Sequence, residues 1–231
     1  MRSVACVVVV LVLCGRGDSS DKRDVDFSCC TPKAWTSQMR LVTASVTRAR
    51  NEYRETWQTY HYDSENQREA WTDVIQDGHV LYSKIIVDFT KHTMTILLDT
   101  DRCKVYKIQG DFQPHCTPVN ISMVLFAVAP VLSPVEGTFA NTVYYGGDGV
   151  TGHMTVTVGQ CALVEEAIFR SSIIDGSVVD SVKYFNQTLT VDPSVFDIPK
   201  HVQCPVVPPD DVDDTHVETF SRLTGFRRSL L

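Results

Sequence analysis

The sequence predicts an all-β protein, a sandwich or open barrel of antiparallel strands. Two observations predict this class. Along most of the chain after Tyr53, apolar side chains alternate with polar ones, which is the period of a half-buried strand. Turn-forming stretches such as Asp77-Gly78 and Asp175-Gly176 separate these runs, with no amphipathic helical stretch between them. Of the 231 residues, 43% are hydrophobic, enough to bury a core in one domain of this length.

Two runs form the clearest pair of strands. Residues 84–89 place Ile85, Val87 and Phe89 on one face, and a second run repeats the alternation after a short polar break. Because the break is short, the pair is predicted to form a β-hairpin. On the apolar face of the second run lie Met94, Ile96 and Leu98.

Other runs have the same strand character, rich in β-branched and aromatic residues: 56–62, 154–158, 161–170 and 178–191. Two segments are ambiguous. Residues 43–55 fit either a short polar helix or a strand. Residues 123–132 are apolar except for Pro130, and fit either a buried strand or a lipid-facing loop.

The two ends of the chain differ from its body. Residues 1–17 have a positive start, an apolar stretch and small residues for cleavage, the pattern of a secretory signal peptide. That stretch is too short to span a membrane, which takes roughly 20 apolar residues. Residues 205–231 begin with prolines and an aspartate cluster, which predicts a mobile tail. The β domain is therefore expected over residues 18–204.

Cysteine usage agrees with export. Six cysteines remain after the signal peptide, and an even number in an exported chain predicts three disulfides. A zinc site would need closely spaced Cys and His pairs, and the sequence has none. Two Asn-X-Ser/Thr sequons, at Asn120 and Asn186, further predict a glycoprotein.

Nucleic-acid binding and common catalytic chemistries find no support. The net charge of −7 argues against phosphate-backbone binding, which needs a basic face. The stretch 147–152 fits the GxGxxG pattern, but an alternating strand follows it where a dinucleotide site needs a helix, so we interpret it as a turn. With no catalytic motif or metal-ligand spacing elsewhere, we expect a protein that is not an enzyme.

Calcium is a more open question. Residues 63–66 and 99–101 resemble the start of an EF-hand loop, but both lack the glycine and glutamate that such a loop requires. No cofactor is expected, and the sequence leaves open a weaker calcium site built from loop carboxylates.

The apolar strands suggest a ligand pocket. Strands that are apolar on both faces can cover a core on one side and a cavity on the other, and curled sheets hold small hydrophobic ligands in this way. Plain sandwich packing fits the same pattern, so both interpretations stay open. The candidate lining residues are Ile85, Val87, Phe89, Met94, Ile96 and Leu98, with Met123, Leu125 and Phe126 near the mouth.

A series of short motifs resembles the ependymin-related proteins. Cys30-Thr31-Pro32-Lys33-Ala34-Trp35, preceded by Cys29, is similar to their opening motif. Tyr62-Asp63-Ser64-Glu65-Asn66-Gln67-Arg68 resembles their hairpin motif, and Asp192-Pro193-Ser194-Val195-Phe196 resembles their ending. With Cys103, Gly146-Gly147, Cys161 and Cys204, the matches run in order over nearly the whole mature chain.

The resemblance implies a fold and a bond pattern. The fold would be two stacked antiparallel sheets curled around a hydrophobic pocket, as in bacterial lipoprotein carriers. The cysteine pairs it implies are Cys29–Cys161 and Cys103–Cys204, which leaves Cys30 and Cys116 for each other.

The resemblance also implies a function. The family is secreted, in some members also lysosomal, glycosylated and non-enzymatic, and it binds lipids or other hydrophobic molecules and calcium. We therefore expect a secreted glycoprotein that binds a lipid or fatty-acid-like molecule, and a homodimer is in keeping with the family. The alternative is an extracellular-matrix adhesion glycoprotein acting through calcium and self-association.

Overall fold

The computed structural model describes residues 28–47, 51–98, 102–117, 121–128, 139–147, 150–172 and 176–208. The expected signal peptide, Asn120 and residues 209–231 of the expected tail lie outside these ranges, as do Asp99 and Asp101.

Eleven strands and one short 3-10 helix make up the described chain. Six of the strands, β2, β4, β5, β9, β10 and β11, lie over runs that the sequence predicts to be strands. Their bounds are β1 (Ala34–Val46), β2 (Asn51–Asp63), β3 (Arg68–Gln76), β4 (His79–Asp88), β5 (Thr93–Leu97), β6 (Cys103–Lys107), β7 (Ile121–Val128), β8 (Phe139–Gly147), β9 (Val150–Thr157), β10 (Leu163–Ser172), β11 (Gly176–Thr188) and η1 (Pro193–Phe196).

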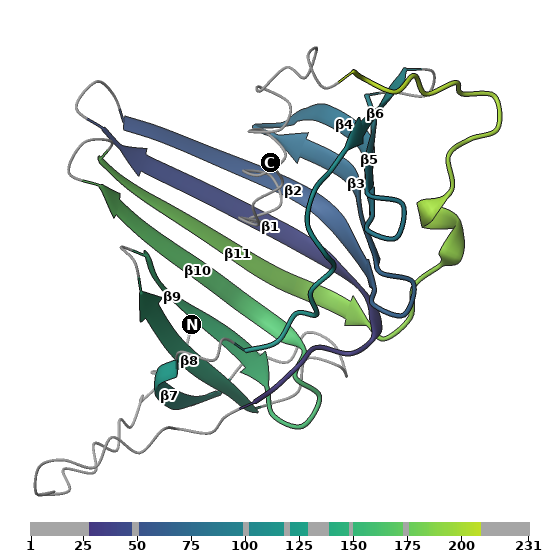
Figure 1. The fold of residues 1–231 in the computed structure, drawn as a ribbon. Coiled ribbons are helices and arrows are strands. Elements are labelled where there is room, and N and C mark those ends of the chain that lie inside the picture. Colours follow the sequence, from purple (N-terminus) through teal and green to yellow (C-terminus); the bar gives the residue numbers. More distant parts are fainter. Residues whose placement is uncertain are drawn as a thin grey trace, which may run out of the picture.

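All eleven strands form one antiparallel sheet, in the order β6-β5-β4-β3-β2-β1-β11-β10-β9-β8-β7. The all-β prediction is confirmed. The structure differs from two separate stacked sheets in that hydrogen bonds join the strands continuously. In Figure 1 the strands β1, β2 and β7–β11 form a broad half, while β3–β6 turn away from it to form a second half. The first and last strands of the chain, β1 and β11, pair with each other at the centre of the sheet.

The hairpin prediction is confirmed, since β4 pairs with β5 through Ile85↔Ile96 and Val87↔Met94. The two ambiguous segments are also decided. Residues 43–55 include the end of β1 and the start of β2, which pair with each other, so the described residues of this range, 43–47 and 51–55, belong to the β1–β2 pair and not to a helix. In the segment 123–132, the described part is a strand, β7, paired with β8. The stretch 147–152 links β8 to β9, whose ends pair through Gly147↔Val150, as the turn interpretation requires.

One face of the sheet, here called the inner face, carries the main core. On β1 the buried residues alternate, with Trp35, Met39 and Leu41 at most 2% exposed. Their register partners on β2 and β11 continue the same face, because cross-strand neighbours point to the same side of a sheet. The core cluster includes side chains from both halves: Trp35, Met39, Tyr60, Tyr62, Trp71, Ile85, Val87, Met94, Tyr106, Val143, Met154, Leu163, Val182 and Tyr184.

A smaller cluster lies on the opposite, outer face of β3 and β4. Phe196 of η1 packs there against Ala70 and Ile86, with Val191 and Val195 beside it. The helix is capped by Asp192, whose carboxylate accepts from the Ser194 N–H at 2.9 Å. The segment after β11 therefore returns across the sheet and covers the outer face of the second half (Figure 1).

The edge strand β6 is covered by the C-terminal segment. The Val105 N–H donates to Pro205 O at 2.9 Å and the Val207 N–H donates to Val105 O at 2.8 Å. The Cys103–Cys204 disulfide fixes the same contact. Residues 205–207, which the sequence assigns to the tail, are thus bonded to the sheet. This covering removes an open strand edge that would favour aggregation.

Replacing both Cys103 and Cys204 by serine is expected to lower the free energy of unfolding by about 4–5 kcal/mol, because the bond closes a long loop in the unfolded chain. Urea unfolding of the oxidised wild type and the double variant measures the change. A loss below about 1 kcal/mol would show that this bond does not constrain the unfolded chain.

Candidate functional site

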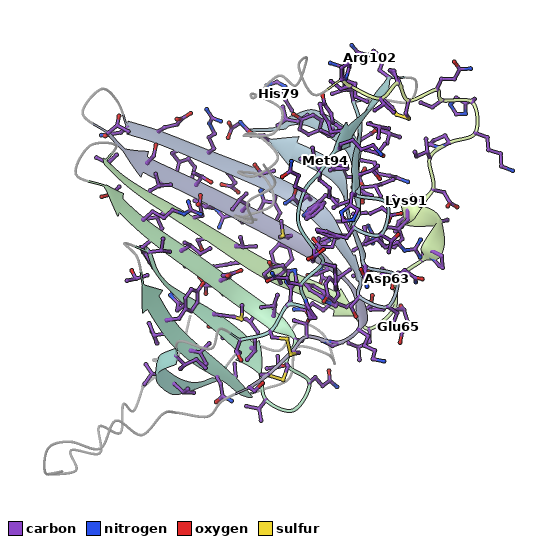
Figure 2. All side chains as sticks on the ribbon, in the orientation of Figure 1. Asp63, Glu65, His79, Lys91, Met94 and Arg102 are labelled. Carbon is purple, nitrogen blue, oxygen red and sulfur yellow. A yellow bond between two sulfur atoms is a disulfide. The ribbon has the colours of Figure 1, made fainter. Side chains whose placement is uncertain are left out.

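The hydrophobic residues predicted to line a pocket lie together on the inner face. Ile85, Val87, Met94 and Ile96 are 0–2% exposed, and Phe89, just after β4, is 5% exposed. Leu98 is partly buried against the same cluster. Met94 lies among the side chains that gather between the turned strands (Figure 2). In this structure the six residues are part of the packed core.

A segment between β6 and β7, residues 108–117, covers this part of the core. Ile108 is 6% exposed, and the Phe112 ring lies 5.4 Å from that of Phe89 and 5.8 Å from that of Tyr62. Most other residues from 109 to 114 are exposed, so the segment has one apolar side and one solvent side. We refer to residues 108–117 as the covering segment.

The residues predicted near the mouth lie on the opposite edge of the sheet from β4 and β5. Met123, Leu125 and Phe126 belong to β7, the last strand in the sheet order. Leu125 is 45% exposed, whereas its neighbour Val124 packs against the core. Because successive residues of a strand point to opposite faces, Leu125 lies on the outer face of β7.

Aromatic side chains that the sequence analysis did not nominate form the centre of the inner face. Trp35 contacts Tyr60 at 5.2 Å and Tyr184 at 5.7 Å between ring centroids, and Tyr60 contacts Trp71 at 5.2 Å. The aromatic residues among polar ones in the predicted strand 56–62 indicate two of them, Tyr60 and Tyr62. Their meeting with Trp35 and Tyr184 depends on the β1–β2 and β1–β11 register, which no local pattern encodes.

Polar atoms are buried inside this aromatic centre. Glu69 is fully buried, and neither of its carboxylate oxygens, nor Trp35 Nε1, has a hydrogen-bond partner within the described ranges. His115 Nε2 lies 3.5 Å from Glu69 Oε1 and 3.3 Å from the Tyr60 hydroxyl. Burial, together with the nearby Glu69 carboxylate, raises the pKa of Tyr60 well above its ordinary value. Buried polar atoms without partners are costly, which marks them as places where water or a ligand would add hydrogen bonds.

The inner face becomes polar toward the far end of the broad half. Asp180 accepts from the Thr43 hydroxyl at 2.8 Å and pairs with Arg170. The Tyr145 hydroxyl donates to Glu166 at 3.1 Å, and burial, with the Glu166 charge, raises the pKa of Tyr145. The same face therefore runs from an apolar, aromatic centre to charged side chains.

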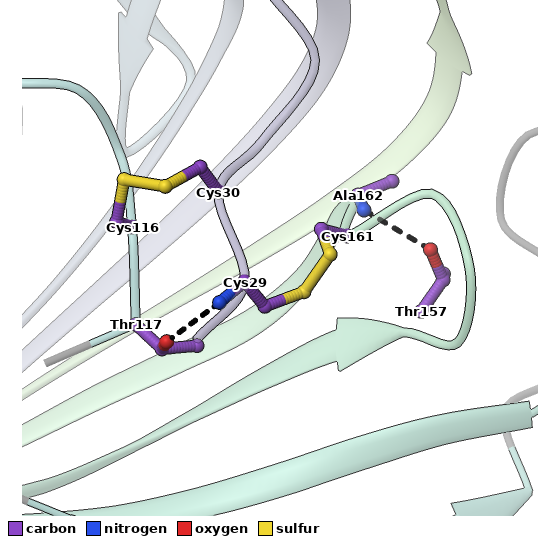
Figure 3. The surroundings of a disulfide bond; sticks show 7 residues. All are labelled: Cys29, Cys30, Cys116, Thr117, Thr157, Cys161 and Ala162. Carbon is purple, nitrogen blue, oxygen red and sulfur yellow. Dashed lines mark hydrogen bonds between the residues drawn. A yellow bond between two sulfur atoms is a disulfide. The ribbon is translucent and has the colours of Figure 1, made fainter. Parts of the chain in front are cut away.

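Two of the three disulfides lie next to each other, because they use the adjacent residues Cys29 and Cys30 (Figure 3). Cys29 bonds to Cys161, just before β10, and Cys30 bonds to Cys116 of the covering segment. The Cys29 N–H donates to the Thr117 hydroxyl at 3.1 Å, and two backbone hydrogen bonds reinforce the contact. Together with Cys103–Cys204, the Cys29–Cys161 bond is a pair that the family resemblance implies, and Cys30–Cys116 is the pair that those two leave over. Three disulfides indicate an oxidising environment, and no helix among the described residues has the length and apolarity to cross a membrane.

The hairpin motif and the ending motif, far apart in sequence, meet on the outer face. Asp63 accepts from the Asn66 backbone and side chain at 3.1 and 2.8 Å and from Arg68 Nε at 2.9 Å. The Arg68 guanidinium in turn lies 4.1 Å from the centre of the Phe196 ring. Burial acts to raise the pKa of Asp63, but the hydrogen bonds from Asn66 and Arg68 outweigh it and hold that pKa below its ordinary value.

These contacts bear on the calcium hypothesis. Both Asp63 oxygens accept hydrogen bonds from the chain itself, so the residues 63–66 loop is folded around its own carboxylate. In the part of the chain that the structure describes, no group of three or more His, Cys, Asp or Glu side chains is placed to hold a metal ion. Asp99 and Asp101 are not in that part.

Of the two sequons, Asn186 is described. It is exposed, near the end of β11, with a positive φ of 53° that asparagine tolerates better than most residues.

No protein-family model and no curated protein matches this sequence. Among solved structures, an uncharacterized conserved protein from Thermus thermophilus is similar at 9% identity, with a TM-score of 0.45, over 76% of this chain and 91% of that one. PNGF-II, in two crystal forms, gives TM-scores of 0.28 and 0.30 at 7% identity over 81% of this chain. The chain spans 33% and 34% of the two PNGF-II chains. At these TM-scores the similarities carry no argument.

Replacing Asp63 by asparagine is expected to lower the free energy of unfolding at pH 7 by about 2 kcal/mol, because an amide cannot accept all the hydrogen bonds that the carboxylate accepts. The folded-state pKa of Asp63 is depressed, so its contribution is present above the unfolded pKa of about 3.9 and disappears as the pH falls through the folded value. Urea unfolding from pH 7 to pH 3 should therefore show the wild-type advantage shrinking below about pH 4.

Glu65→Gln is the matched control, because Glu65 lies in the same hairpin and its ion pair with Lys33, which precedes β1, is exposed. It should change stability by less than about 0.5 kcal/mol. Equal losses in the two variants would contradict the special role of Asp63.

Proposed function

We propose that this protein is a secreted, non-enzymatic glycoprotein that binds a hydrophobic ligand, a lipid or fatty-acid-like molecule, against the inner face of its curled sheet. The observation that carries the proposal is the composition of that face. An apolar, aromatic centre encloses the Glu69 carboxylate, which lies 3.5 Å from His115 Nε2, and Trp35 Nε1, which has no hydrogen-bond partner among the described residues; charged side chains lie farther along the same strands. The order of motifs that resembles the ependymin-related proteins supports the same function.

The chemistry of the inner face fits an amphiphile. A hydrocarbon chain that leaves water gains about 25 cal/mol per Å² of apolar surface buried. A hydroxyl or amide group on the same molecule would donate to the Glu69 carboxylate, and an oxygen would accept from Trp35 Nε1. Such partners would offset the cost of leaving these atoms unpaired, about 1–3 kcal/mol each.

The covering segment is the place where a ligand would enter. It packs on the core through Ile108 and Phe112 and is otherwise largely exposed. Its end is fixed by Cys30–Cys116 and by the Thr31 N–H donating to His115 O at 2.8 Å. Displacing Phe112 would uncover Phe89 and Tyr62 while leaving the disulfides intact, so the sheet itself need not open.

Native mass spectrometry and lipid extraction of the protein, purified from a eukaryotic secretory host, test the proposal directly. We expect a bound amphiphile in a fixed ratio to the protein. Protein that stays free of ligand under these conditions, and that does not bind a fluorescent fatty acid, would overturn it.

Phe112→Ala is expected to speed release of a fluorescent fatty acid by about tenfold, since removing a contact worth about 1.4 kcal/mol changes an equilibrium or rate by that factor. Stopped-flow displacement measures the release rate. Phe196→Ala removes the same side chain from the outer face and is the control. It should lower thermal stability without changing release, and equal release rates in the two variants would contradict entry beneath the covering segment.

A second candidate function is adhesion in the extracellular matrix through calcium and self-association. It is favoured by the large apolar side chains exposed on the broad half, with Val46 at 58%, Tyr53 at 61% and Phe169 at 42%. Exposed apolar surface of this kind is found where proteins associate.

If a folded-state calcium site supports this second function, millimolar calcium should raise the unfolding temperature relative to protein in chelator, because an ion that binds only the folded state stabilises it. Sedimentation should then show larger assemblies in calcium. An unchanged unfolding temperature, with the protein monodisperse in both buffers, would exclude it.

A further inference from the structure

Two aromatic rings meet on the outer face of the broad half. Trp57 of β2 and Phe185 of β11 lie on either side of β1, and their ring centroids are 5.7 Å apart. Trp57 is 43% exposed, whereas the other two tryptophans, Trp35 and Trp71, are 1% exposed. We call Trp57 and Phe185 the outer aromatic pair.

Polar neighbours fix the orientation of the exposed indole. Trp57 Nε1–H donates to Glu55 Oε1 at 2.7 Å, and Arg40 donates to both Glu55 oxygens at 2.9 and 3.0 Å. The Arg40 guanidinium lies 5.6 Å from the centre of the indole ring. A surface tryptophan held in place by three groups has lost its conformational freedom before any ligand arrives, which favours binding to its free face.

The described sequon, residues 186–188, begins beside this pair. Asn186 directly follows Phe185, and its Nδ2–H donates to Gln38 Oε1 at 2.8 Å. Gln38 is the register partner of Phe185 on β1, and its side chain is exposed on the outer face. The Asn186 amide nitrogen is therefore directed along the outer face, across the strand over which the two rings meet.

We propose that the outer aromatic pair is the packing site for the first sugars of an N-linked glycan on Asn186. The inference rests on the proposed secretion and goes beyond it, because it assigns a binding surface to the glycan. N-acetylglucosamine has an apolar C–H face and an N-acetyl methyl group that bury well against aromatic rings. Its hydroxyls would form hydrogen bonds with Gln38 and Arg40, which lie beside the outer aromatic pair.

The attachment reaction leaves this geometry intact. The Asn186 Nδ2 forms a bond to the first sugar carbon of a polyprenyl-diphosphate-linked oligosaccharide. The sugar–oxygen bond breaks, the polyprenyl diphosphate leaves, and one Nδ2 proton is lost. The second Nδ2 proton remains and still donates to Gln38, which keeps the sugar directed along the outer face.

Acrylamide quenching of tryptophan fluorescence tests the packing, because Trp57 is the exposed one of three tryptophans. Acrylamide is neutral, so the Arg40 charge does not bias its approach. Removing the sequon by Thr188→Ala should raise the quenching constant about twofold, since the sugar would cover the ring face that Arg40 leaves free. This change leaves Asn186, with its positive φ, in place, and Thr190→Ala is the matched control outside the sequon.

Enzymatic trimming locates the contact within the glycan. Protein trimmed to a single N-acetylglucosamine should keep the low quenching constant of the fully glycosylated form. Quenching that is the same with and without the glycan would overturn the proposal, as would a mass spectrum in which Asn186 of the secreted protein carries no sugar. Fatty-acid binding by Thr188→Ala, measured in parallel, reports on the proposed function separately, and neither result decides the other.

A thermal cycle gives an independent readout. Loss of the glycan should lower the unfolding temperature by about 2–4 °C in the wild type, the shift expected for about 1 kcal/mol in a chain of this size. In a Trp57→Ser background the same loss should have no effect. Equal shifts in both backgrounds would overturn the packing, because they would mean that the glycan acts without touching Trp57.

Discussion

The rest of the structure depends on the contacts of one buried indole, Trp35. Its ring meets Tyr60 and Tyr62 of the strand on one side and Tyr184 of the strand on the other. These rings hold the centre of the sheet, where the first and last strands of the chain pair. Since aromatic side chains bury more apolar surface than most, the four rings supply a large share of the burial at the centre of the broad half. The indole N–H has no hydrogen-bond partner in the described chain. The free energy gained by burying the ring is therefore partly offset by the cost of one unsatisfied donor.

The class of fold could be predicted from local patterns, and the arrangement of the strands could not. Alternation along residues 84–98 predicts the β4–β5 hairpin because its turn and its register are encoded within a few residues of each other. The β1–β11 pairing joins Leu41 to Val182, residues far apart in the chain, and no local pattern specifies it. The predicted lining residues do share one face, as their spacing indicates. Whether that face lines a cavity or a core depends on the covering segment, which has no strand or helix pattern to predict it.

The two faces of the broad half differ in their chemistry: the inner face is buried and aromatic, and the outer face is exposed and carries charged groups. The inner face encloses its polar groups among aromatic rings, so that a ligand there would exchange water for a dry environment. The outer face carries Trp57 at the surface, with Glu55 held ionised because Arg40, Trp57 and Tyr53 all donate to it, which lowers its pKa to about 2. Strand alternation alone produces this division, since Trp57 and Gln58 are neighbours in sequence and point to opposite sides.

The adjacent cysteines 29 and 30 have a consequence for how the chain is oxidised. Exchanging their partners would change each closed loop by a single residue, so loop-closure entropy hardly distinguishes the native pairs from the swapped ones. The distinction comes from the folded backbone, in which Cys29 is buried toward Cys161 and Cys30 is exposed beside Cys116. The native bonds therefore become the favoured set only once the sheet has assembled around them. Wrong pairs that form before the sheet assembles would have to reshuffle by thiol–disulfide exchange before the native set is reached.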